Sequence, residues 1–209
     1  SGISGGVLMS SGDATAGDSG DINIESGDAV AGVGGTISVL VGSGDAGTAG
    51  DVIITAGTHT GTAGSASSGG DIVVTSGSST PSSSGDIQLT AGTTYDAADV
   101  GVGVGGEVRI FGGLGAAESG GAGGDVDITG GESQSTLTGY TGGNVNIAGG
   151  QADAGTGGDI TVTTGSSTAA TSGTLTLQTA NAGTSGISGG VLMSSGDATA
   201  GDSGDINIE

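Results

Sequence analysis

The sequence predicts an all-β fold, a β-solenoid (β-helix), on three observations. A nine-residue motif, small-Gly-x-U-x-U-x-x-Gly with U an aliphatic residue, recurs along the 209 residues. Its two U positions are separated by one residue, which is the period of a short half-buried strand. Apolar residues nowhere follow helical spacing, and the 52 glycines would interrupt any helix.

The motif recurs with a basal period of 15 residues. Clear copies are SGDINIESG at 19–27, AGDVIITAG at 49–57 and GGDVDITGG at 123–131. The first aliphatic residues of successive motifs lie 15 to 21 residues apart, and the longest steps fall between residues 52 and 145. We therefore expect coils of 15–21 residues, with Gly and Asp at the corners.

A weaker alternation of small residues lies between the motifs and predicts a second short strand in each coil. It is seen at Ala14 and Ala16, Ala29 and Ala31, Ala46 and Thr48, and Ala152 and Ala154.

A single coil of this kind is not expected to be stable alone. It would bury only two aliphatic side chains while ordering the backbone of the whole coil. Stacked coils, about 4.8 Å apart, would join these side chains into two continuous apolar ladders. Stability would then be a sum over neighbouring coils.

A longer repeat contains the short one. Residues 1–25 recur without change as residues 185–209, an offset of 184 residues. We interpret 1–184 as one tandem unit of about 11 coils and 185–209 as the start of the next. Residues 1–209 then form one continuous solenoid segment, and since neither end shows a capping coil, we expect the natural object to be longer.

Composition excludes several function classes. One Lys or Arg stands against 22 Asp and Glu, giving a formal net charge of −21. Such a chain has no surface for nucleic acid or anionic membranes, and no apolar run approaches the roughly 20 residues of a membrane span. There is no Cys, and His59 is the only strong base available to activate a nucleophile. We expect no catalytic residue, no cofactor-binding residue and no enzyme activity.

Calcium is the one cofactor that the pattern suggests. Acidic residues often stand directly before the first aliphatic residue, and stacked coils would align them in a column. Ca²⁺ takes several carboxylate oxygens and could bridge such a column. The alternative is that each carboxylate caps its own turn and faces solvent. The candidate ligands are Asp51, Asp71, Asp86, Glu107 and Asp125.

A second candidate site is an apolar band on the alternate face of the predicted strands. Leu40, Ile53, Val73 and Phe111 are apolar where other motifs carry polar residues, and the longer linkers add Tyr95 and Tyr140. Two interpretations stay open: the longer linkers fold back over these residues, or the residues form a lateral contact patch.

One Ser/Thr-rich stretch surrounds the only proline. Ser79, Thr80 and Ser82 are candidate O-glycosylation sites, because such stretches often accept O-glycans. The alternative is a plain flexible turn.

Long tandem arrays of GGDIxIxxG-type coils, rich in Gly, Ser, Thr and Asp, resemble the giant extracellular β-solenoid repeat proteins of cell-surface filaments, including flagellar hairs and adhesin stalks. The resemblance implies an extracellular structural filament that stacks end to end and packs laterally with copies of itself. Other filament proteins or glycans are further expected partners. The alternative function is an adhesive or ligand-binding surface stalk for glycans or, less in keeping with the mixed outward residues, ice.

Overall fold

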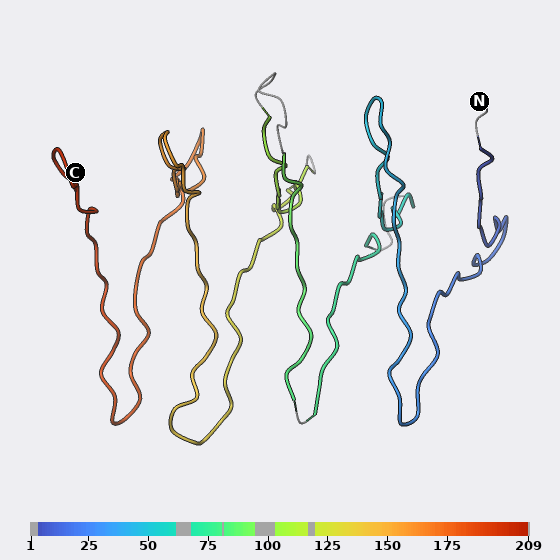
Figure 1. Ribbon diagram of the computed structural model, residues 1–209, viewed down its shortest axis with the longest axis horizontal. Coiled ribbons are helices and arrows are strands. Elements are labelled where there is room, and N and C mark those ends of the chain that lie inside the picture. The colour runs from blue at the N-terminus through green and yellow to red at the C-terminus, as the bar shows by residue number, and fades with distance from the viewer. Residues whose placement is uncertain (1–3, 62–67, 81, 95–102, 117–119, 209) are drawn as a thin grey trace. The chain divides into compact units, whose positions relative to one another are not determined.

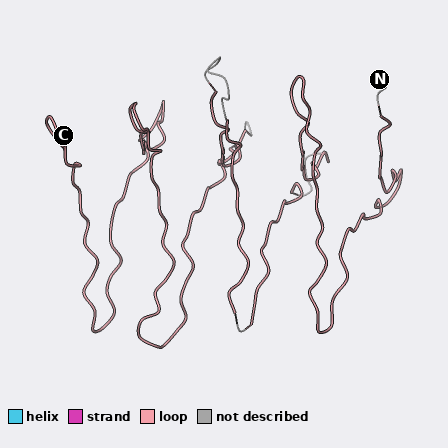
Figure 2. Cartoon of the chain, viewed as in Figure 1, coloured by secondary structure: helices cyan, strands magenta, loops and turns pink. Residues whose placement is uncertain are grey.

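The computed structural model describes residues 4–61, 68–80, 82–94, 103–116 and 120–208. It divides into two units, Ser1–Val108 and Arg109–Glu209. Throughout the described ranges both units consist of loops and turns, with no helix and no strand (Figure 2). The described part therefore holds no helix that is long and apolar enough to cross a membrane.

The predicted β-solenoid is wrong for the described residues. They form no strand, and no hydrophobic side chain among them is buried. The chain exposes 20216 Å², more than twice the roughly 8,300 Å² expected of a compact monomer of 18.9 kDa. Two aliphatic side chains per motif do not offset the cost of ordering a glycine-rich backbone. Stacking would also align acidic residues of like charge, which opposes it further.

Extended runs joined by bends replace the predicted coils (Figure 1). In unit 1 the bends fall at 15–17, 30–32 and 45–47, and unit 2 has bends at 153–155, 168–170 and 199–201. Four of them overlap the small-residue alternation, so the predicted second strand is also wrong there. The reason is local: Gly17 and Ala31 take φ values of 106° and 59°, which turn the chain out of the β region.

Successive motifs meet at a recurring backbone hydrogen bond between glycines, which we call the closure bond. The glycine two residues before the first aliphatic residue donates its N–H to the carbonyl oxygen of the preceding motif's final glycine. The N···O distances are 2.8–3.0 Å. The donor and acceptor pairs are Gly70 and Gly57, Gly85 and Gly77, Gly106 and Gly92, Gly124 and Gly113, Gly143 and Gly131, Gly158 and Gly150, and Gly173 and Gly165.

The closure bonds separate a constant part of the repeat from a variable part. Between the opening and the final glycine of one motif, the spacing is always seven residues, as from Gly70 to Gly77 and from Gly143 to Gly150. Between motifs, the bond spans 8 residues at Gly77 and Gly85 but 14 at Gly92 and Gly106. The irregular period of the sequence therefore arises in the linkers, each of which returns to the same bond.

The residue before each final glycine lies against the closure bond. Ala56, Ser76, Ala91 and Thr164 occupy this place and are half-buried in a chain that is otherwise almost wholly exposed. At three closures this residue is itself glycine. A Cβ on Gly112, Gly130 or Gly149 would meet the carbonyl oxygen of Gly124, Gly143 or Gly158, respectively. At these three positions only glycine fits without a shift of the backbone.

A single methyl group should therefore open one linker. In Gly130→Ala the new Cβ collides with the Gly143 carbonyl, and losing one hydrogen bond should lower the closed population of linker 132–142 about fivefold. The temperature coefficient of the Gly143 amide proton, measured by NMR, should move toward that of a solvent-bonded amide. Gly131→Ala is the matched control, because nothing lies within 4 Å of its Cβ. Equal changes in the two variants would contradict the steric explanation.

Candidate functional site

The aliphatic residues of the motifs, which we call the motif aliphatics, form the largest set of exposed apolar side chains. Those at the first position are 47% to 63% exposed, apart from Val7 at 93%, and those at the second position are 59% to 84% exposed. The sequence predicts these side chains to be the core, and the structure leaves them in solvent. In unit 2 they are Ile110, Val126, Ile128, Val145, Ile147, Ile160, Val162, Leu175, Leu177, Val191, Met193, Ile206 and Ile208.

The difference between the two positions follows from the closure bond. A first-position residue such as Val145 stands two residues after the donor glycine Gly143, so it begins the run close to the preceding motif. A second-position residue such as Ile147 stands three residues before the final glycine Gly150, in the middle of the run. This gives 49% exposure for Val145 and 72% for Ile147. Sequence periodicity alone treats the two positions as equivalent and does not signal this difference.

The predicted lateral-contact residues are exposed where the structure describes them. Leu40, Ile53, Val73 and Phe111 are 79% to 83% exposed, and Tyr140 is 68% exposed. The longer linkers thus do not cover these side chains in the described ranges. Tyr95 lies outside the described residues. The lateral patch itself stays a prediction.

The candidate calcium ligands are not brought together. Asp51, Asp71, Asp86 and Asp125 are exposed. Glu107 takes part in an interaction within the chain. Across the described ranges no three His, Cys, Asp or Glu side chains gather into a group that could hold a metal ion.

The hydroxyl-rich stretch around residue 81 is accessible. Ser79, Thr80 and Ser82 are exposed, and the hydroxyls of Ser79 and Ser82 lie 3.3 Å apart, within hydrogen-bonding distance. This pairing holds the two ends of the turn together and is compatible with either a plain turn or modification. O-glycosylation here stays a prediction.

Two linkers are held by side-chain hydroxyls. Ser26 donates its hydroxyl to the carbonyl oxygen of Gly35 at 3.0 Å, and Thr94 donates to the carbonyl oxygen of Val104 at 2.9 Å. Both hydroxyls lie at or just after the end of a motif and reach to the start of the next. A hydroxyl can thus join linker ends as a glycine amide does elsewhere, a role that the sequence pattern does not reveal.

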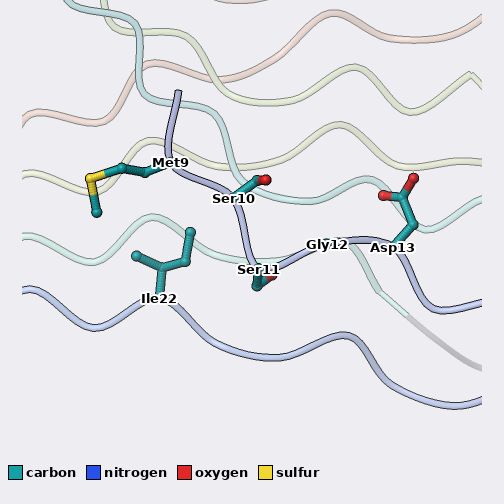
Figure 3. A pocket seen from close by; sticks show the side chains of 6 residues that line it. All are labelled: Met9, Ser10, Ser11, Gly12, Asp13 and Ile22. Atoms are coloured by element: carbon teal, nitrogen blue, oxygen red, sulfur yellow. The ribbon is translucent and has the colours of Figure 1, made fainter. Parts of the chain in front are cut away.

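Two shallow hollows occur in the described part of the chain, both within the duplicated 25-residue segment. The first is lined by Met9, Ser10, Ser11, Gly12, Asp13 and Ile22. Figure 3 shows the Met9 and Ile22 side chains at one end of this hollow and the Asp13 carboxylate at the other. The second is lined by Asp197, Ala198, Gly201, Asp202 and Ser203. Neither lining brings a base beside a hydroxyl as nucleophilic catalysis requires.

No family model, curated protein or solved structure matches this chain. The resemblance to extracellular filament proteins therefore stays a prediction drawn from the motif alone.

Calcium should act on this chain only as a screening ion. Because the acidic side chains are dispersed, calorimetric titration with CaCl₂ should show no saturable binding tighter than about 10⁻³ M. Asp125→Asn should behave like Asp127→Asn, a matched change of one acidic residue two positions further along the chain. Saturable binding that Asp125→Asn removes and Asp127→Asn leaves intact would contradict this expectation.

Proposed function

We propose that this chain is a repeated structural segment of an extended extracellular filament that associates with copies of itself. The observation that carries the proposal is the recurrence of residues 1–25, unchanged, as residues 185–209. Conserving a fold does not need such identity, because aliphatic and hydroxyl residues can replace one another at motif positions. Identity over 25 residues is typical of tandem units in a long array.

The exposure of the chain supports the same role. A binding protein or enzyme concentrates its polar groups in one concave site, whereas here the apolar side chains recur in every motif and stay accessible. Surfaces that repeat along a chain serve contacts that repeat along a filament. In this role the chain catalyses no reaction and carries no resident cofactor.

The charge fits an extracellular filament. A net charge of −21 keeps separate chains soluble and opposes non-specific association. Salt at about 0.15 M reduces the range of this repulsion to about 8 Å, so chains can approach before repulsion dominates. The proposal therefore expects assembly under the ionic conditions outside cells.

An adhesive stalk is the second candidate, favoured by linker 132–142. This linker is fully described, and it holds Leu137 and Tyr140 at 69% and 68% exposure. Tyr offers a flat apolar face with a polar tip, which suits a polar ligand such as a glycan. The linker occurs once per 184-residue unit, so ligand sites would recur along a stalk.

Assembly of the purified 209-residue chain separates the two candidates. At about 0.15 M salt we expect concentration-dependent growth into fibres, seen by sedimentation velocity and negative-stain electron microscopy. A chain that stays monomeric at every concentration and binds immobilised glycans would contradict the filament proposal and favour the stalk. Tyr140→Ala should leave fibre growth unchanged in the first case and abolish glycan binding in the second.

A further inference from the structure

We propose that the motif aliphatics, rather than the alternate-face residues Leu40, Ile53, Val73 and Phe111, form the surface on which a second copy of this chain docks. This inference rests on the proposed filament function and names the contact surface for it. It reverses the sequence-based expectation, in which the motif aliphatics form an internal core and the alternate face makes the contacts.

The first argument is the apolar area that one unit presents. A fully exposed aliphatic side chain offers about 100 Å², given about 2.5 kcal/mol for its burial at about 25 cal/mol per Å². The motif aliphatics of unit 2 retain roughly six-tenths of this exposure, which amounts to on the order of 800 Å². A standard stable interface buries about 800 Å² on each partner. Unit 2 alone therefore presents enough apolar surface for a stable contact.

The alternate face does not reach this area. Its apolar residues occur in only a few motifs, and other motifs carry Asn23, Gln88, Asn146 or Thr161 at comparable places. In unit 2 the predicted alternate-face set contributes Phe111 alone. Such an interrupted patch leaves polar groups without partners at most motifs, which costs free energy on burial.

The second argument is the unpaired backbone of the motifs. In the described ranges every recorded backbone-to-backbone hydrogen bond joins two glycines, and none joins a motif aliphatic. The N–H and C=O groups beside the motif aliphatics therefore face solvent. A partner that runs along an extended segment can bond these groups while it covers the apolar side chains.

The third argument concerns which partner fits. The motif aliphatics recur in constant seven-residue runs between glycines, so a matching surface must offer apolar side chains with the same spacing. A second copy has this spacing by identity, and the shift of 184 residues provides a second equivalent register. The hollow between Met9 and Ile22, open in Figure 3, shows that adjacent motifs leave space between their aliphatic side chains.

Charge distinguishes a second copy from a basic partner. Acidic residues such as Asp71 and Asp125 stand directly before motif aliphatics, so two copies bring like charges together. Their association should strengthen as salt rises from about 0.01 M to 0.15 M, where the screening length falls from about 30 Å to 8 Å. Binding to a basic surface would weaken over the same range.

Two matched double variants test the surface. Ile54→Thr with Val74→Thr changes two motif aliphatics, and Ile53→Thr with Val73→Thr changes their alternate-face neighbours in the same motifs. Both pairs remove the same atoms, and all four side chains are exposed, so no core is lost. The full 209-residue chain is used, and the concentration at which assembly begins is measured by light scattering and sedimentation velocity.

We expect the Ile54 and Val74 pair to raise this concentration about tenfold and the Ile53 and Val73 pair to change it less than about twofold. An equal or larger effect of the Ile53 and Val73 pair would overturn the inference and leave the filament proposal standing. Assembly of the wild-type chain that weakens with salt would also overturn it. A wild-type chain that never assembles would overturn both.

Discussion

The closure bond between glycines is the constraint on which the rest of this structure depends. It recurs where one motif ends and the next begins, and at three junctions the neighbouring position must also be glycine because a Cβ would reach the opposite carbonyl. The bond fixes the two ends of every seven-residue run but contributes nothing to covering the side chains between them. The exposure of the motif aliphatics follows directly from this arrangement.

Two opposing forces act on such a chain, and both grow with the number of motifs. Each motif adds two apolar side chains that favour association, and the acidic residues, 22 along the chain, add repulsion. Because both recur along the sequence, a longer array gains attraction and repulsion together. The balance is then set by salt, whose screening weakens the repulsion and leaves apolar attraction intact. A filament segment with this composition would be soluble as single chains and associate under saline conditions.

The sequence predicts the local features well and the long-range packing poorly. Motif boundaries and glycine turns depend on neighbouring residues, and the prediction that glycine supplies positive φ is confirmed at Gly12. The stacking of Ile22 or Val126 into a core depends on pairing between distant segments, which no local pattern establishes. The bend at Ala31 was predicted as a strand because alternation of small residues does not distinguish a strand from a bend. For the candidate site, the sequence located the exposed Ile53 and Val73 but assigned the motif aliphatics to the interior.

Amide hydrogen exchange of the dispersed chain at low salt, resolved by NMR, tests the central claim most directly. Protection should be confined to the glycines that donate closure bonds, such as Gly85, Gly143 and Gly158, while the amides of motif aliphatics such as Val126 and Ile128 exchange as in an unstructured chain. Slow exchange at the motif aliphatics, with no protection at the donor glycines, would contradict the account. That pattern would mean that hydrogen bonds between the extended runs, rather than closure bonds between glycines, hold the chain.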